Sequence, residues 1–188
     1  MINWRSPCKQ FFHSLSVIRI LGIDPGSRIT GYGVIDVDGA RTFYVASGGI
    51  KTAGDALAPR LSRIFDGVTA AIEEYNPQEM AVELVFMNRN ADSALKLGQA
   101  RGAALVAGAK RGLPVFEFTP AQIKQAIVGR GNAEKAQIQH MIKVLLNLEA
   151  PPETDAADAL AVALCHGHTR QGLLRMPGVR RNRRRRFL

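Results

Sequence analysis

The sequence is poor in the residues that define several common classes of protein. Its 188 residues include only two cysteines, Cys8 and Cys165, too few for a disulfide framework in a chain of this length. Cys165 lies in the apolar run "ALAVALC", so we expect a reduced thiol in the core. No apolar run approaches the roughly 20 residues that span a bilayer, and no signal-type cleavage site follows the N-terminal stretch. We therefore expect a cytoplasmic protein with no membrane anchor.

Acidic residues are missing from both ends of the chain. None precedes Asp24, and all 16 lie in residues 20–169, which carry 14 lysines and arginines and so have a net charge of −2. The formal charge of +9 therefore comes from the two ends, above all from the run "RRNRRRR" at Arg180 to Arg186. We expect this run to be a basic, disordered tail that either contacts nucleic acid or stays solvated.

The length and the 46% of hydrophobic residues predict one domain with a sizeable core. Short turns separate the first three predicted strands, at 19–24, 31–36 and 41–50, which is typical of an antiparallel meander. The spacing of apolar residues then predicts alternating helices and strands, in the order helix 57–75, strand 80–86, helix 92–110, strand 113–118, and helices 120–128, 133–148 and 154–168. This order predicts the α/β class, a mixed sheet of three antiparallel strands followed by parallel strands, with helices on both faces.

Four carboxylates stand in unexpected places. Asp24 ends an apolar strand, and Glu83 lies inside the apolar run "MAVELVF". Asp155 and Asp158 are three residues apart, so they share one face of an apolar helix. The helix dipole favours acids in a first turn, which explains Asp155 better than Asp158. Taken singly, each acid could be a turn or helix-end residue, but together they predict a site for Mg²⁺ or Mn²⁺, ions that prefer oxygen ligands.

Two further patterns each have a simple structural explanation. His166 and His168 are two residues apart, so they do not face each other on a helix, and we expect a solvated helix end there rather than ligands. The helix at 92–110 carries small residues, among them Gly98 and Gly102. It is a candidate for contact between subunits, or alternatively for tight packing within one chain.

Four segments give the sequence a family resemblance. The runs "ILGIDPGSRITGYGVI", "ELVFMNRNADSALKLGQARG", "QIKQAIVGRGNAEKAQIQHM" and "DAADALAVALCH" closely resemble the RuvC family of Holliday junction resolvases. The resemblance extends from about Ile18 to His168 and implies a ribonuclease H-like fold. It also implies that the catalytic, metal-binding acids are the four already singled out: Asp24, Glu83, Asp155 and Asp158.

The resemblance implies an activity in homologous recombination and DNA repair. A homodimer would resolve a four-way junction by nicking two strands of like polarity, leaving 5′-phosphate and 3′-hydroxyl ends. Two Mg²⁺ ions at each active site, replaceable by Mn²⁺, would support the hydrolysis. The enzyme would act after a branch-migration motor complex of the RuvA and RuvB type.

Several residues gain a possible role in DNA binding from this resemblance. Phe86 would stack on a base near the junction centre, although a core position is an equal alternative. Lys124 and Lys135 match basic residues beside the active site, where the alternative is a solvated helix face. Arg89 and Arg130 are further candidates for phosphate contacts, with less support from the resemblance. Ser27 and Arg28, in the glycine-rich turn, could also approach phosphate.

The first 17 residues have no counterpart in the family. Val17 stands where the family's initiator would be, and an internal GTG codon is read as valine, so we predict that the native protein starts at Val17. The expected organisation is therefore an unmatched extension at 1–17, a nuclease domain at 18–170 and a basic tail at 171–188.

Three other functions are consistent with parts of the sequence. A nuclease acting on RNA–DNA hybrids would use the same four acids. The run "DPGSRITGYG" also resembles the phosphate loop of actin-like ATPases and sugar kinases, although these need a larger two-lobed chain. A junction-binding protein without activity would fit the basic tail, but not four carboxylates beside DNA phosphates.

Overall fold

The structure is a computed structural model that describes residues 17–52, 54, 56–84, 91–131 and 133–175, the side chains of residues 174 and 175 excepted. The chain forms five strands and five helices in these residues. The strands are β1 (Ile18–Asp24), β2 (Ile29–Asp38), β3 (Arg41–Lys51), β4 (Glu79–Glu83) and β5 (Val115–Phe118). The helices are α1 (Leu57–Tyr75), α2 (Ala91–Lys110), α3 (Pro120–Val128), α4 (Lys135–Leu145) and α5 (Thr154–Arg175).

One mixed sheet contains all five strands in the order β3-β2-β1-β4-β5. β1 pairs antiparallel with β2, and β2 with β3, which confirms the predicted meander. β1 pairs parallel with β4, and β4 with β5. The crossover helices needed between parallel strands are α1 and α2. The predicted α/β class and the mixed sheet are therefore confirmed.

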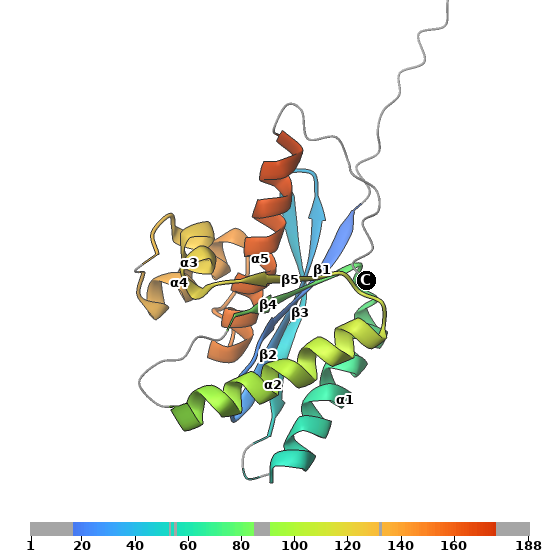
Figure 1. Cartoon of the computed structure of the whole chain (residues 1–188). Coiled ribbons are helices and arrows are strands. Elements are labelled where there is room, and N and C mark those ends of the chain that lie inside the picture. Colours follow the sequence, from blue (N-terminus) through green and yellow to red (C-terminus); the bar gives the residue numbers. More distant parts are fainter. Residues whose placement is uncertain (1–16, 53, 55, 85–90, 132, 176–188) are drawn as a thin grey trace, which may run out of the picture.

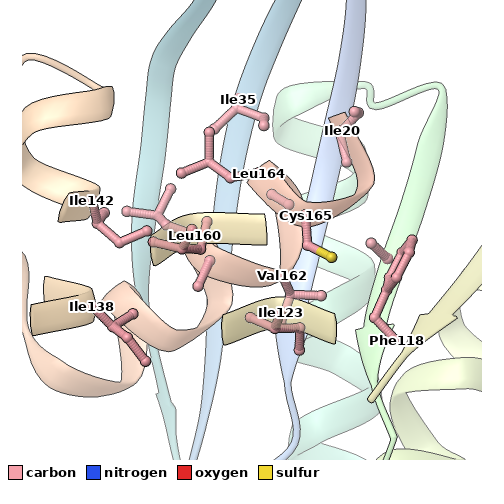
Figure 2. Close-up of a cluster of buried hydrophobic side chains, with 14 of the residues drawn as sticks. Ile20, Ile35, Phe118, Ile123, Ile138, Ile142, Leu160, Val162, Leu164 and Cys165 are labelled. Atoms are coloured by element: carbon pink, nitrogen blue, oxygen red, sulfur yellow. The ribbon is translucent and has the colours of Figure 1, made fainter. Parts of the chain in front are cut away.

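Helices cover both faces of the sheet (Figure 1). α1 and α2 lie on one face, over Leu21 of β1 and Met80 of β4. α5 lies on the other face, with α3 and α4 packed against it. Figure 2 shows this second core, where Leu160 and Leu164 of α5 lie among side chains from the sheet, α3 and α4. Because successive side chains of a strand point to opposite faces, each strand's alternate residues divide between the two cores.

The N-terminal half of α5 is buried from Ala156 to Cys165, apart from the half-buried Asp158. A helix that is apolar all round must be enclosed by neighbours, which explains its central position. Three strand glycines allow it to lie close to the sheet. A Cβ atom added to Gly22 or Gly31 would overlap the carbonyl oxygen of Ala159 or Asp155, and one added to Gly33 would lie 2.7 Å from the Leu160 nitrogen. These glycines are therefore required by helix packing.

Helix boundaries follow from local capping chemistry. α1 is capped at its C-terminus by Asn76, which has a left-handed backbone conformation. The Asn76 N–H donates to the Ile72 carbonyl. α3 begins as predicted, because Thr119 Oγ1 accepts a hydrogen bond from the Gln122 N–H at 3.1 Å. α4 starts at Lys135, two residues later than the predicted start at 133, and it ends at Leu145 rather than near 148.

The predicted solvated helix end at His166 and His168 is wrong. His166 is only 4% exposed, and its Nε2 lies 2.6 Å from Glu79 Oε2. Its ring stacks on Phe116 with 4.2 Å between centroids. The Nδ1 atom of His168 lies 3.1 Å from the Ala126 carbonyl oxygen. α5 does not end at 168 as predicted but continues to Arg175, so both histidines lie inside the helix and face β4, β5 and α3.

Arg170 belongs to the same buried group. Its Nη1 lies 2.6 Å from the second oxygen of Glu79, which therefore has two cationic or hydrogen-bonding neighbours on α5. Burial raises the pKa of the Glu79 carboxyl, but the hydrogen bond to His166 and the charge of Arg170 outweigh it and lower the pKa overall. The group joins the first residue of β4 to the C-terminal half of α5.

No helix in the described part of the chain is both long enough and apolar enough to cross a membrane. Cys165 is a buried free thiol, as expected for this core position, and burial raises its pKa to about 11.

Candidate active site

The sheet brings two of the four acids together at one edge. Asp24 is the last residue of β1 and Glu83 the last residue of β4. The two strands run parallel side by side, with Ile23 opposite Val82, so Asp24 and Glu83 are neighbours in the next register position. Both belong to the face of the sheet that α5 covers, because Ile20 and Ala81 of the same alternating sets lie in the α5 core.

The first turns of α5 bring the other two acids to the same place. Asp155 is the second residue of the helix, and Asp158 follows one turn later on the same face. The close packing of α5 fixes this position, since the Asp155 carbonyl oxygen lies directly over Gly31, the β2 partner of Asp24. The four acids therefore come from β1, β4 and α5 and lie around one opening.

The charges of these acids strongly affect one another. Burial and the neighbouring carboxylates raise the pKa of Asp24 to about 8, with Glu83 the strongest charged neighbour, followed by Asp158 and Asp155. Burial also raises the pKa of Glu83, although a hydrogen bond from Asp24 acts in the opposite direction. The pKa values of Asp24 and Glu83 are therefore both raised, and the two carboxyls titrate together rather than independently. Such a cluster has an excess of negative charge that a cation would offset.

Two lysines lie beside the acids, as the family resemblance implied. Lys135, the first residue of α4, places its Nζ 2.7 Å from Asp158 Oδ2. Burial lowers the pKa of Lys135, but the hydrogen bond and charge of Asp158 outweigh this effect and raise it overall. Lys124 of α3 is close enough that its charge lowers the pKa of Glu83. Both lysines line a hollow of about 220 Å³ between α3, α4 and α5.

A wider cleft of about 600 Å³ opens over the acids on the side of the β1–β2 loop. It shares Glu83, Lys135 and Asp158 with the smaller hollow, so the two hollows are continuous at the acids. All four carboxylates line this cleft together with the loop at 25–28 and, from α2, Leu97. No local pattern predicts Leu97 at this site, since its position depends on how α2 crosses the sheet.

The donor set fits a hard divalent cation better than zinc. The cleft is lined by four carboxylates and by no histidine or cysteine of the described residues, and the histidines of α5 are engaged with β4 and α3. Among the described residues, no three acidic, histidine or cysteine side chains lie together closely enough to hold an ion as they stand.

The remaining predicted DNA-binding residues are not at this cleft or are not described. Arg130 is exposed at the end of α3 and lines a separate hollow of about 530 Å³ with His140 and Met141 of α4. Phe86 and Arg89 lie outside the described residues. Their roles, and that of Arg130, stay predictions.

Comparison with known proteins identifies the family. Residues 20–166 match the family described as crossover junction endodeoxyribonuclease RuvC. The chain belongs to the RuvC family. It is 60% identical over 159 residues to the RuvC of Pseudoalteromonas atlantica, covering 85% of this chain and 92% of that protein. The RuvC of Hahella chejuensis is 55% identical over 168 residues, covering 89% and 98%.

A solved structure supports the same assignment. The structure of Thermus thermophilus RuvC in complex with a Holliday junction substrate matches with a TM-score of 0.78 and 35% identity. The match covers 82% of this chain and 96% of the Thermus protein. The fold is therefore the ribonuclease H-like fold of RuvC. RuvC proteins are metal-dependent nucleases, which agrees with the carboxylate cluster described above.

Proposed function

We propose that this chain is a crossover junction endodeoxyribonuclease that resolves four-way DNA junctions. Two subunits each nick one of two strands of like polarity and leave 5′-phosphate and 3′-hydroxyl ends. The observation that carries this proposal is the cleft in which β1, β4 and α5 gather four carboxylates beside Lys135, with Lys124 in the adjoining hollow, in a chain of the RuvC family. Resolution of junctions belongs to homologous recombination and DNA repair, in the cytoplasm.

The proposed cofactor is Mg²⁺, two ions to each active site, with Mn²⁺ as a substitute. Asp24, Glu83, Asp155 and Asp158 would hold them. Two bound ions supply an activated water and a Lewis acid for the leaving oxygen of a phosphodiester.

The chain's own residues have further parts in this proposal. Lys124 and Lys135 bring positive charge to the edge of the cleft, where a phosphate enters between α3 and the acids. Lys135 also orients Asp158 through their ion pair.

The proposed homodimer would use the outer face of α2. Ala100, Ala104 and Ala107 pack into the core of their own chain, so this face of α2 is occupied by intramolecular contacts. On the other face, Leu95 is 66% and Val106 is 52% exposed, and Gly98 and Gly102 have open space where a Cβ would stand. Leu95, Gly98, Gly102 and Val106 form one stripe at helical spacing, which would allow a second subunit to approach closely. A branch-migration motor complex of the RuvA and RuvB type is proposed as a further partner.

A competition experiment tests the substrate. A labelled, mobile four-way junction is incubated with the full chain and Mg²⁺ in the presence of excess RNA–DNA hybrid, and the products are mapped at nucleotide resolution. We expect paired, symmetric nicks whose products a ligase can seal, with little inhibition by the hybrid, and no cleavage in EDTA. Cleavage of the hybrid in preference to the junction would instead support the hybrid-specific nuclease.

A further inference from the structure

The β1–β2 loop forms one wall of the wide cleft. The proposed chemistry assigns no role to this loop. The loop consists of four residues, Pro25 to Arg28, between the end of β1 and the start of β2. All four line the cleft together with the acids. Lys135 also lines this cleft, from the α4 side, whereas Lys124 lines only the smaller hollow, so Arg28 is the basic residue on the loop side of the cleft.

The backbone of this loop is firmly held. The Arg28 carbonyl accepts hydrogen bonds from the Thr52 N–H at 2.9 Å and from Thr52 Oγ1 at 3.3 Å. Thr52 follows β3 and is only 1% exposed, so it anchors the loop to the interior. At the other end of the loop, the Gly26 N–H lies 3.4 Å from Oγ1 of the buried Thr30. The loop therefore presents the Arg28 side chain from a fixed base.

The Arg28 side chain is exposed and does not neutralise the neighbouring acids. In the part of the chain that the structure describes, Lys135 forms an ion pair with Asp158, whereas no carboxylate lies within ion-pair distance of Arg28. A guanidinium fixed at the rim of a cleft, and not engaged by a carboxylate, remains available for an external anion such as a phosphate.

We propose that Arg28 binds a backbone phosphate of the DNA strand that is cut, one or more nucleotides away from the scissile bond. A strand that crosses the two continuous hollows would meet Lys124 on one side of the acids and Arg28 on the other. Arg28 is thus a positioning residue that fixes the register of the strand over the carboxylates. The proposal rests on the proposed function, since it assumes a DNA strand in this cleft.

The test compares Arg28→Gln, Arg28→Lys and the control Arg41→Gln. Arg41 is also exposed, but it lies in the β2–β3 hairpin at the end of the sheet away from Asp24, where it pairs with Asp38. Binding of the full chain to a labelled four-way junction is measured in EDTA at salt concentrations from 50 to 200 mM. Cleavage is then measured in Mg²⁺ as a single-turnover rate at saturating enzyme.

We expect Arg28→Gln to reduce the slope of log affinity against log salt by about 0.9 for each Arg28 that contacts a phosphate. The affinity should fall by about 3- to 10-fold at 0.1 M salt, whereas the saturated cleavage rate should stay within about threefold of the wild-type rate. Arg28→Lys should keep most of the slope, because the slope counts neutralised phosphates. Arg41→Gln should keep the wild-type slope.

A slope for Arg28→Gln equal to that of Arg41→Gln, in a chain that binds and cuts the junction normally, would overturn the role of Arg28. A slope for Arg28→Lys as low as that of Arg28→Gln would do the same. If the wild-type chain itself neither bound nor cut the junction, the proposed function would fail instead, so the two failures are distinguishable.

Discussion

Asp24→Asn is expected to abolish junction cleavage while making the protein more stable in buffer without divalent ions. Asp24 lies between Glu83 and the two acids of α5, so its loss removes a carboxylate from the centre of the cluster. We expect the cleavage rate in Mg²⁺ to fall by about 10³-fold or more, as is usual when a metal-binding or charge-stabilising group is lost from an active site. Junction binding should persist.

The gain in stability follows from the pKa of Asp24. An ordinary aspartate has a pKa near 3.8, whereas in the folded protein the pKa of Asp24 is raised to about 8. Between these values the folded state holds a proton that the unfolded state has released, so raising the pH from about 4 to about 8 weakens the folded state. Asparagine removes this penalty, and we expect a gain of about 1–3 kcal/mol in the free energy of unfolding at pH 8, with a smaller gain at pH 5.

Urea unfolding at both pH values in EDTA measures this effect, alongside cleavage assays. Asp38→Asn is the matched control, because Asp38 lies in the β2–β3 hairpin and forms only a surface pair with Arg41. It should change stability by less than about 0.5 kcal/mol and leave cleavage unchanged. An Asp24→Asn protein that is less stable than wild type at pH 8, or that still cleaves at a similar rate, would contradict the description of the site.

Gly31→Ala is expected to damage both the fold and the activity. The added Cβ would overlap the carbonyl oxygen of Asp155, so the first turn of α5 must move away from the sheet. Overpacking of this kind costs about 1–3 kcal/mol. The displaced turn carries Asp155 and Asp158, and a displacement of about 1 Å at a catalytic group can cost about 100-fold in rate. We therefore expect lower stability and a strongly reduced saturated cleavage rate.

A glycine in open space on the same helix provides the control. Gly172 lies near the end of α5 and has nothing within 4 Å of an added Cβ. Gly172→Ala should stabilise the protein by up to about 1 kcal/mol through better helix propensity, with normal cleavage. Thermal unfolding and single-turnover cleavage distinguish the two variants. Wild-type stability and activity in Gly31→Ala would show that α5 does not pack on β2 as described.

The acids of the site could be predicted because their positions break a local pattern. A carboxylate at the end of an apolar strand, or two on one face of an apolar helix, is costly unless something offsets the charge. The sequence therefore singled out Asp24, Glu83, Asp155 and Asp158 before any family was considered. That they meet in one cleft depends on the pairing of β1 with β4 and on the crossing of α5, which no local pattern determines.

Glu79, the other acid of β4, was not predicted to be important, because its partners also come from α5. Glu79 and Glu83 occupy the two ends of one short strand on the same face, but Glu79 precedes the apolar run that makes Glu83 stand out. α5 also distinguishes them, because its C-terminal half brings His166 and Arg170 to Glu79 while its N-terminal half brings Asp158 near Glu83. The prediction that His166 and His168 are solvated was wrong because the partners of His166 are distant in sequence.

The glycines that follow Asp24 have two different roles. Gly26 lies in the β1–β2 loop, which is the glycine-rich turn of the sequence. Gly31 and Gly33, however, belong to β2 and are required by the close approach of α5. A contact between elements more than 120 residues apart leaves no mark in a short window of sequence.

The most direct measurement of the central claim is calorimetric titration of Mn²⁺ into the wild-type chain and Asp24→Asn, in buffers of different ionisation enthalpy. If the four acids form one metal site, binding must displace the proton held by Asp24. We predict that binding at pH 7 releases close to one proton per subunit in the wild type, fewer above pH 8, and none in Asp24→Asn. Wild-type binding without proton release, or the same release by the variant, would contradict the claim that Asp24 and its three neighbours form the metal site.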